Sequence, residues 1–425
     1  MRPLKYDVIV AGGGPAGMCA AMQSAAAGAR TLLVERGSML GGTTNTAGVN
    51  FPGIFHAWGR QVIRGYGWKL VEHCVAESGG ELPAFFDPPV PSRHWMHQVR
   101  VDRALYTMLC DEHVSRTGAE ILFHTMPAKL EARETGWRVT VCGKTGLFEL
   151  DATCLVDCTG DANLVTMAAG DLLDAGGEKQ PGTYVCRASG YDPDTLDLEQ
   201  IDAAFQEALA RGEVLPHDAG WDVNTPVASR WLRNLGENAN HIPGIDARDS
   251  EGRTRMEIEG RKAILRMYRF LRRQPGLENL RFEFLAPECG VRETARIAGD
   301  VTITAEDYQS GRVWPDALSH SFYPIDLHTA GGSGLNKIGL APGTVPTVPR
   351  GALLPKRLKR IAVGGRCVSS DRAANSALRV QASAMAMGQA SGAMAALAAQ
   401  TGVDMRDLPI EDIRALLRTH DAIVP

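Results

Sequence analysis

The sequence of 425 residues lacks the features that mark several large protein classes. Its nine cysteines include no Cys-x-x-Cys pair, which argues against a disulfide framework, a zinc site or an iron–sulfur cluster. The most apolar late segment, residues 384–399, is interrupted by Gly388, Gln389, Ser391 and Gly392. It is too short and too weakly apolar to span a bilayer. We therefore expect neither a membrane span nor a bound metal.

A strong excess of charge is also missing, because the formal net charge is only −4. A nucleic-acid-binding protein usually has a dominant basic stripe, and the sequence contains none. The segment from Met1 to Tyr6 lacks the apolar core and cleavage site of a signal peptide. These absences predict a cytoplasmic protein without nucleic-acid or membrane partners. The hydrophobic content of 44% is sufficient for a sizeable core.

One glycine-rich segment near the start gives a strong signal. Residues 6–35, YDVIVAGGGPAGMCAAMQSAAAGARTLLVE, have the pattern of a strand, a turn, an alanine-rich helix and a second strand ending in Glu35. Gly12 permits the tight turn, Gly14 lets the backbone approach a pyrophosphate, and Gly17 lets the helix pack close to the strand. The pyrophosphate then lies at the positive end of the helix, and Glu35 binds the adenosine ribose. The unit predicts a dinucleotide site and leaves NAD and FAD open.

A second cluster of glycines and hydroxyl side chains follows, from Arg36 to Gly48. Such a loop can wrap an extended cofactor and offer N–H groups and hydroxyls to phosphate and ribityl oxygens. An ordinary flexible loop is the alternative interpretation of the same composition.

The pattern changes after a helix that is expected to end at Gly118. Alternating segments with glycine turns then predict strands, the later ones antiparallel, at residues 121–123, 129–132, 137–142 and 147–150. A further buried strand at residues 154–158 stops at Thr159-Gly160-Asp161. A parallel sheet interrupted by an antiparallel meander, and then a strand ending in Thr-Gly-Asp, favours FAD over NAD. Asp161 is placed to accept a ribityl hydroxyl and also to cap the next helix.

Four separated motifs resemble the FAD-dependent oxidoreductases that are related in fold to the flavoprotein subunits of fumarate reductase and succinate dehydrogenase. They are VAGGGPAG with Glu35, DCTGDA, GVRETARIAGD followed by YPIDLH, and LLPKRLKRIAVGGRCVSSDRAANSALRVQASAMAMGQASG. These motifs lie within residues 5–175 and 255–420, whereas residues 176–250 resemble no segment of that family.

From the motifs and this resemblance we expect an α/β fold with two domains. A Rossmann-like FAD-binding domain, with a parallel sheet and an antiparallel meander, is expected from residues 1–175 and 340–425. An inserted substrate or cap domain is expected at residues 176–339. Some relatives attach FAD covalently through a histidine in the glycine- and hydroxyl-rich loop, but Gly42 to Thr46 contains none. We therefore expect non-covalent FAD. No second Gly-x-Gly-x-x-Gly unit follows, so the electron partner is left open.

Two later motifs contain the candidate chemistry. In GVRETARIAGD, Arg292 and Arg296 are four residues apart and are expected on one helical face. There they could clamp a substrate carboxylate or stabilise reduced flavin, or they could be structural and pair with acids such as Asp300. In SFYPIDLHTAGG, Asp326 and His328 are expected on one face of an extended segment. His328 is then a candidate general acid or base.

The segment GGRCVSSDRAANSALRV combines small residues with positive charge directly after an apolar strand. The small residues let the backbone approach the flavin. We expect Arg372, Asn375 and Ser376 near the start of a long helix whose free N–H groups face the pyrimidine edge of the flavin. Arg366 and Arg372 add positive charge there, whereas Arg379 is expected to be structural.

The sequence thus predicts an enzyme that transfers a hydride between a small polar or anionic metabolite and non-covalently bound FAD. The alternative is a flavin-binding redox sensor or assembly protein without turnover. The substrate, the direction of electron flow and the oligomeric state are left open. The predicted catalytic residues are Arg292, His328, Arg296 and Arg372. The predicted cofactor-binding residues are Gly12, Gly14, Pro15, Ala16, Gly17, Glu35, Arg36, Gly41, Gly42, Thr43, Thr44, Asp157, Gly160, Asp161, Gly365, Arg366, Asn375 and Ser376.

Overall fold

The computed structural model of the chain describes residues 5–85, 96–173, 176–329 and 334–425. The first four residues of the segment considered as a signal peptide lie outside the described residues, as does the expected domain boundary at residue 175. Within the described ranges, no helix has the length and apolar character needed to cross a membrane. In those same ranges, no group of three or more His, Cys, Asp or Glu side chains is arranged to hold a metal ion.

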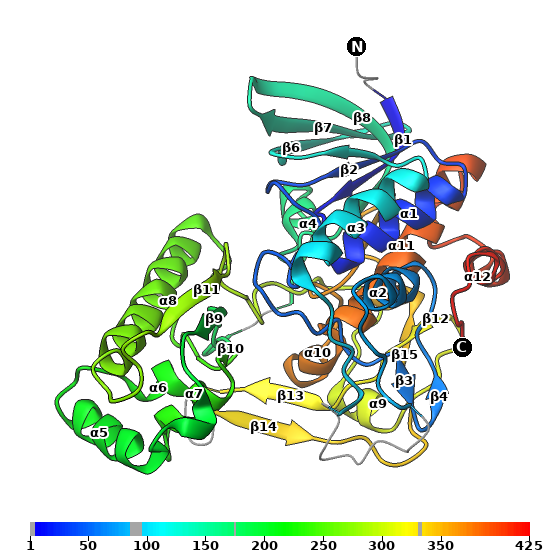
Figure 1. Cartoon of the computed structure of the whole chain (residues 1–425). Helices are drawn as coiled ribbons and strands as arrows, with labels where there is room; N and C mark the ends of the chain where they lie inside the picture. Colours follow the sequence, from blue (N-terminus) through cyan, green and yellow to red (C-terminus); the bar gives the residue numbers. More distant parts are fainter. Residues whose placement is uncertain (1–4, 86–95, 174–175, 330–333) are drawn as a thin grey trace.

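A seven-stranded sheet forms the centre of the larger unit, in the order β5-β2-β1-β8-β7-β6, with β16 also paired to β8 (Figure 1). The strands β1, β2, β5, β8 and β16 pair in parallel, whereas β6, β7 and β8 form an antiparallel meander. The predicted Rossmann-like α/β class is therefore confirmed. Their bounds are β1 Lys5–Ala11, β2 Thr31–Val34, β5 Glu120–Leu122, β6 Met126–Arg133, β7 Gly136–Gly143, β8 Gly146–Asp157 and β16 Ile361–Val363.

The last two strands expected in this region are one continuous strand, β8. Residues 146–152 of this strand pair antiparallel with β7, and residues 151–157 pair parallel with β1, so the two pairings overlap. The separation expected around residues 151–153 was wrong because strand β8 crosses from the meander into the parallel part of the sheet without a turn.

Helices cover the sheet, and two of them pack unusually closely. Helix α1 (Pro15–Ala26) lies against α11 (Gln381–Thr401). A Cβ atom on Gly388 would lie 2.0 Å from the carbonyl oxygen of Ala16, so only glycine allows this approach. The alanine- and glycine-rich sequence of both helices thus fixes α11 beside the glycine-rich turn. The neighbouring helices are α2 Tyr66–Glu77, α3 Arg103–Arg116 and α12 Ile410–Thr419.

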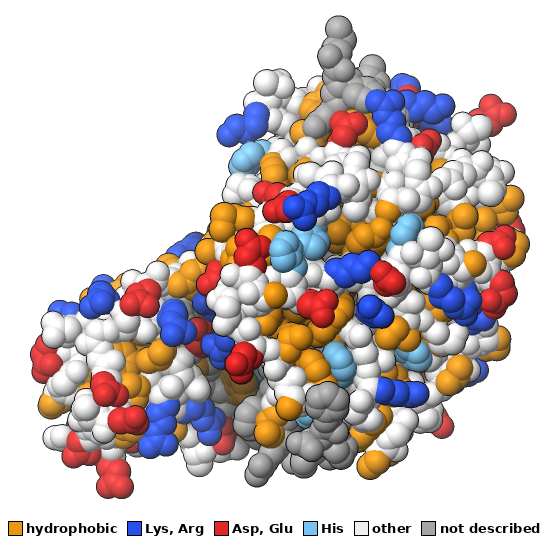
Figure 2. All heavy atoms as spheres, turned by 45° about the vertical axis from the view of Figure 1, so that its right-hand side comes forward, with side chains coloured by type: hydrophobic (Ala, Val, Ile, Leu, Met, Phe, Trp, Pro, Cys, Tyr) orange, Lys and Arg blue, Asp and Glu red, His pale blue; other side chains and the backbone are white. Residues whose placement is uncertain are grey.

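A smaller unit with its own apolar core extends from the larger one (Figure 1). Its sheet has the order β10-β9-β11, and its core includes Phe205, Trp231 and Phe270. On the face shown in Figure 2, acidic and basic side chains are interspersed over both units. The elements are β9 Cys186–Ser189, α5 Leu198–Ala210, α6 Pro216–Ala219, α7 Ala228–Arg233, β10 Gly236–Glu237, α8 Ser250–Leu271 and β11 Arg281–Leu285.

The remaining elements join the two units or complete the larger one. The hairpin of β13 and β14 reaches toward the smaller unit (Figure 1). These elements are β3 His56–Ala57, β4 Arg60–Gln61, α4 Asn163–Met167, η2 Pro193–Thr195, α9 Ala305–Gln309, β12 Ala317–His320, β13 Ile325–His328, β14 Leu335–Ile338, β15 Thr347–Pro349, η3 Arg350–Ala352 and α10 Arg372–Leu378.

Two expectations about helices were wrong. Residues 291–300 form no helix, so Arg292 and Arg296 do not share a helical face. This segment instead makes isolated bridges, such as the one between Leu172 and Ile297. The expected single C-terminal helix is two helices, α10 and α11, because the backbone of Val380 is extended (φ −66°, ψ 152°).

Candidate active site

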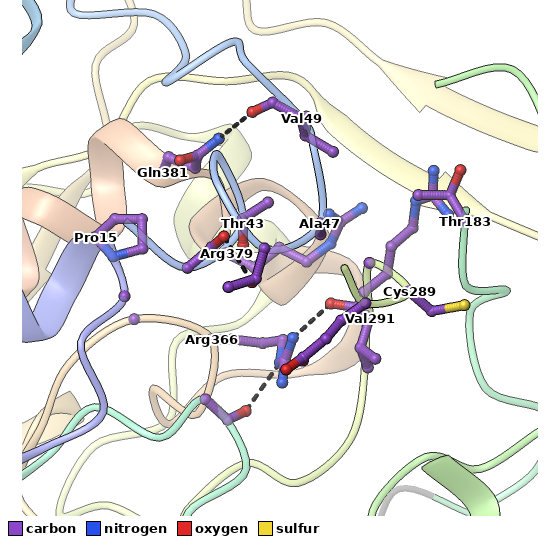
Figure 3. A pocket seen from close by; sticks show the side chains of 18 of the residues that line it. Pro15, Thr43, Ala47, Val49, Thr183, Cys289, Val291, Arg366, Arg379 and Gln381 are labelled. Atoms are coloured by element: carbon purple, nitrogen blue, oxygen red, sulfur yellow. Dashed lines mark hydrogen bonds between the residues drawn. The ribbon is translucent and has the colours of Figure 1, made fainter. Parts of the chain in front are cut away.

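A cavity of about 1660 Å³ runs between the two units (Figure 3). Its walls come from the β1–α1 turn, the loop after β2, the Thr-Gly-Asp turn after β8, the segment before Arg292 and the start of α11. Segments far apart in the sequence therefore meet here. They meet at the carboxyl ends of parallel strands, where open α/β sheets bind their ligands.

The glycine-rich turn forms one end of the cavity. Gly12 has a φ of +96°, and a Cβ atom there would lie 2.5 Å from the carbonyl oxygen of Cys158. A Cβ atom on Gly17 would lie 1.7 Å from the carbonyl oxygen of Gly12, so the first turn of α1 needs glycine at this position. Beside Gly14, no heavy atom of the described residues lies within 4 Å of a Cβ position. That open space at the uncapped start of α1 fits a pyrophosphate.

Glu35 lies at the same end of the cavity. Its carboxylate accepts hydrogen bonds from the backbone N–H groups of Gly13, at 2.6 Å, and Gly37, at 2.7 Å. These two bonds fix the carboxylate at the end of β2 on the cavity wall. The position suits a carboxylate that accepts ribose hydroxyls.

The loop after β2 is tied to the start of α11. Gln381 donates from Nε2 to the carbonyl oxygen of Val49 at 3.0 Å (Figure 3) and to that of Phe51 at 3.2 Å. Its Oε1 accepts from the hydroxyl of Thr44 at 2.6 Å. Val380 and Gln381 line the cavity, and Val380 gives α11 no side-chain cap. The helix start that faces the cavity therefore belongs to α11.

Helix α10 begins differently from α11. Asp371 caps α10, accepting from the N–H of Ala374 at 2.7 Å. Asn375 instead donates to the carbonyl oxygen of Arg366 at 2.9 Å, and Ser376 accepts from the N–H of Asp326 at 3.0 Å. The expectation that Asn375 and Ser376 lie at the helix start facing the cavity was wrong, because the extended backbone at Val380 separates the two helices.

The two aspartates around the Thr-Gly-Asp turn have different partners. Asp157 is fully buried and accepts from Thr159, at 2.7 Å from the hydroxyl, and from the N–H groups of Leu164, at 2.8 Å, and Val165, at 3.1 Å. It therefore caps α4 beneath the cavity wall. Asp161, which was expected to cap that helix, is instead on the wall.

Arg366 binds the Thr-Gly-Asp turn to two other segments. Its guanidinium donates to the carboxylate of Asp161 at 2.6 Å, to the carbonyl oxygen of Gly160 at 2.8 Å and to that of Val291 at 2.5 Å (Figure 3). Asp161 also accepts from the hydroxyl of Thr294 at 2.7 Å. Because Arg366 is paired in this way, it holds the wall together and leaves little positive charge free.

Two arginines lie at the other, more buried end of the cavity. Arg292 is 6% exposed and donates to the carbonyl oxygen of Pro181 at 2.7 Å. Burial, together with the nearby charge of Arg379, lowers the pKa of Arg292 to about 9. Arg379 makes long contacts of 3.4 Å to Gln180 and to the carbonyl oxygen of Asp326. Two weakly compensated cations therefore lie side by side on this wall.

A carboxylate and two histidines complete this end. Nε2 of His328 lies 3.2 Å from a carboxylate oxygen of Asp326, as expected from their positions on β13. Nδ1 of His328 lies 2.8 Å from Nε2 of His241. Burial and the charge of Arg292 lower the pKa of His328 to about 4. Burial would raise the pKa of Asp326, but His328, Arg379 and Arg292 lower it to about 2. At neutral pH the histidine is neutral and the carboxylate is ionised.

The predicted residues divide into those on the cavity wall and those behind it. Arg296 lies behind the wall, where it donates to the carbonyl oxygen of Ser370 at 3.0 Å. Arg372 pairs with Glu293 at 2.9 Å and also lies behind it. The wall contains Gly12, Gly14, Pro15, Ala16, Glu35, Arg36, Gly42, Thr43, Gly160, Asp161, Arg292, His328, Gly365 and Arg366. The others behind it are Gly17, Gly41, Thr44, Asp157, Asn375 and Ser376.

Several residues of the site were not among the predicted site residues, and four of them show why. Gln381 follows directly after the helix break that sequence reasoning did not detect. Arg379 was expected to be structural, but it lines the cavity. Trp221 and His241 come from the segment that resembles no known motif, so no signal in the sequence marks them.

The fold and the cavity together define a flavin-dependent oxidoreductase. The chain belongs to the FAD dependent oxidoreductase family, which it matches over residues 7–417. The predictions of an enzyme and of FAD as its cofactor are confirmed by this membership.

Individual relatives match smaller parts of the chain. The 12-dehydrotetracycline 5-monooxygenase/anhydrotetracycline 6-monooxygenase of Streptomyces rimosus is 28% identical over 222 residues, which are 49% of this chain and 38% of that enzyme. The thioredoxin reductase of Bacillus subtilis is 42% identical over 70 residues, 16% of this chain and 21% of that enzyme. The matches thus span less than half the length of these relatives. A geranylgeranyl bacteriochlorophyll reductase-like structure from Thermoplasma acidophilum covers 98% of this chain and 83% of its own, at 13% identity and a TM-score of 0.44.

Proposed function

We propose that the protein transfers a hydride between a small polar or anionic metabolite and FAD that is held without a covalent bond. One observation supports this proposal above the others. A single cavity joins the glycine-rich turn and Glu35 to a buried end with two arginines, a carboxylate and a neutral histidine. Such a cavity can hold a long cofactor at one end and a charged reactant at the other.

FAD supplies the site that accepts or donates the hydride, and the protein supplies position and electrostatics. Gly14 and the start of α1 are suited to hold the pyrophosphate, and Glu35 the adenosine ribose. Asp161 is suited to accept a ribityl hydroxyl, and the start of α11 to face the pyrimidine edge. Arg296 and Arg372, behind the wall, would act as positioning residues through their contacts to neighbouring segments.

An anionic substrate follows from the charges at the buried end. Arg292, Arg379 and Lys337 all lie near the carboxylate of Asp326, and Glu293, which also acts on Arg379, is already paired with Arg372. Positive charge therefore exceeds negative charge at this end. A buried cation without a counter-ion is costly, and a substrate carboxylate can bind guanidinium groups by two parallel hydrogen bonds. His328, neutral beside Asp326, is then placed to hold or release a proton at Nε2.

The expected two-domain organisation is part of this proposal. Residues 1–175 and 340–425 would bind FAD, because they supply the glycine-rich turn, the loop after β2 and the start of α11. Residues 176–339 would bind the substrate, because they supply Arg292 and His328. We further propose a narrower kinship to the flavoprotein subunits of fumarate reductase and succinate dehydrogenase, and a cytoplasmic location. A redox sensor without turnover is the alternative function.

Anaerobic reduction tests the proposal. The purified yellow protein is mixed with a library of small carboxylates and polyols, and loss of the flavin absorbance is followed. We expect one class to bleach the flavin, and Arg292→Leu or His328→Asn to slow bleaching about 100-fold while FAD stays bound. Arg357→Leu, at an exposed arginine that does not line the cavity, is the matched control and should bleach normally. Bleaching that survives both cavity changes would show that these residues are not catalytic, and no bleaching at all would favour the sensor.

A further inference from the structure

Three histidines lie in sequence from the cavity toward the outside of the smaller unit. His328 is on the cavity wall, His241 is 2% exposed behind it, and His217 is half-buried on α6. We propose that His241 and His217 form a proton relay that connects the Asp326–His328 pair to the protein surface. This inference rests on the proposed hydride transfer, which needs a proton to enter or leave the cavity at each turnover.

The inner part of the relay is a continuous chain of hydrogen bonds. Because Asp326 is ionised, its carboxylate can only accept, so we assign a proton to Nε2 of His328, which lies 3.2 Å from that carboxylate. Nδ1 of His328 must then accept, so the 2.8 Å contact requires a proton on Nε2 of His241. Both tautomers are thus fixed by one carboxylate, and Nδ1 of His241 is left as an acceptor.

The outer part of the relay consists of the Nδ1 atoms of His241 and His217, which lack hydrogen-bond partners among the described residues. The backbone N–H of His241 donates to the carbonyl oxygen of His217 at 3.1 Å, which holds the two residues together. The Nδ1 atoms of both histidines are buried, and neither has a hydrogen-bond partner among the described residues. Buried polar atoms of this kind are usually satisfied by a water, which would join the two rings here. The charges of Asp218 and the exposed Glu178 act on His217 and mark the outer end.

The charges around the relay keep the rings neutral at rest. Arg292 faces both inner rings, Arg379 acts on His328, and Asp326 opposes them. Burial and Arg292 make a resident positive charge on either ring unfavourable, and Arg379 adds to this effect at His328. A proton that reaches the chain therefore passes through it and does not stay.

The transfer balances for reduction of a C=O or C=C bond. Nδ1 of His241 takes a proton from the His217 side, its Nε2 proton moves to Nδ1 of His328, and the Nε2 proton of His328 moves to Asp326. Asp326, on the cavity wall, gives that proton to one atom of the substrate bond. The other atom would take the hydride, with its two electrons, which FAD would supply when it is bound and reduced. The transfer leaves the proton of each ring on Nδ1, so both rings must return to the Nε2–H tautomer before the next turnover. Substrate oxidation runs the same steps in reverse from the Nδ1–H tautomers and releases one proton through His217.

Nitrogen-15 NMR of histidine-labelled, FAD-loaded protein at pH 7 tests the relay without turnover. We expect both inner rings to be neutral Nε2–H tautomers, assigned with His241→Gln and His328→Gln. The His73–His113 pair, in contact at 2.9 Å between α2 and α3, is the control and should not respond to His241→Gln. A charged inner ring, or an Nδ1–H tautomer of His328, would overturn the relay.

Kinetics give a second and independent test. His241→Gln and His217→Asn should slow substrate-dependent flavin reduction at least about tenfold with KM nearly unchanged, and added imidazole should restore part of the rate. His113→Gln should leave the rate unchanged. Wild-type rates in both relay variants would overturn the relay while leaving hydride transfer intact. If no metabolite reduces the wild-type flavin, the proposed function fails, and the NMR tautomers alone decide the relay.

Discussion

The glycines of the turn between β1 and α1 differ in what their surroundings allow. Gly17 faces the carbonyl oxygen of Gly12, and a Cβ atom there would approach it to 1.7 Å. Gly14 has an ordinary φ of −73° and open space on its cavity side. Gly17 is thus required by the fold, whereas the fold itself does not require glycine at position 14, where we propose that the pyrophosphate binds.

Alanine substitutions separate these two requirements. Gly17→Ala should lower the free energy of unfolding by about 1–3 kcal/mol, because the turn and α1 must move apart. Gly14→Ala should leave thermal unfolding unchanged and weaken FAD binding about tenfold, because its methyl group enters the pyrophosphate space. Thermal unfolding of the FAD-free protein and FAD fluorescence titration measure the two effects. The distinction would be contradicted if both variants lost the same unfolding free energy and the same affinity for FAD.

The start of helix α11 is hydrogen-bonded to the loop after β2. Gln381 binds the carbonyl oxygens of Val49 and Phe51 and the hydroxyl of Thr44. At the opposite end of the same helix, Gln400 donates to the carbonyl oxygen of Ala27 at 2.7 Å in an exposed position. Substituting each glutamine therefore compares the loss of the same side chain at the two ends of one helix.

Gln381→Ala should release the loop after β2 and leave the partly buried carbonyl groups of Val49 and Phe51 without this donor. We expect a loss of about 1–3 kcal/mol in unfolding free energy and about a tenfold weaker affinity for FAD. Gln400→Ala should change neither by a measurable amount. Urea unfolding and FAD titration of both variants provide the measurement, and wild-type FAD affinity in Gln381→Ala would show that the loop is held by other contacts.

Across the whole molecule, burial keeps several histidines neutral in the folded state. Burial lowers the pKa of His328, His56 and His320 to about 4, and that of His241 to about 2. The ordinary pKa of histidine is near 6.5, so the unfolded chain binds protons between pH 6.5 and 4 that the folded chain does not. Stability must therefore fall as the pH decreases through this window.

Urea unfolding at several values between pH 7 and pH 5, at constant ionic strength, checks this dependence. The unfolding free energy should decrease steadily below about pH 6.5. His320→Asn, which removes one of these histidines away from the cavity, should reduce the slope without affecting FAD binding. A stability that stays flat or rises on acidification would mean that these side chains are protonated in the folded protein.

The sequence by itself determined the features that depend on neighbouring residues. The strand–turn–helix around Gly12 and the Thr-Gly-Asp turn were predictable because local sterics, periodicity and turn chemistry specify them. From these features, the α/β class and FAD followed. The exact extent of β8 did not, because its continuation depends on pairing with β1 and β7 at once.

Only the tertiary structure decided how the buried end of the cavity is assembled. His241 meets His328 across 87 positions of the chain, and Gln381 meets Val49 across 332. The helix expected around Arg292 is absent because bridges to distant segments outweigh local helix propensity there. Contacts of this range are set by the packing of both units around the cavity, which no local pattern encodes. The cofactor was therefore predictable from the sequence, whereas the arrangement of the proposed substrate and proton sites was not.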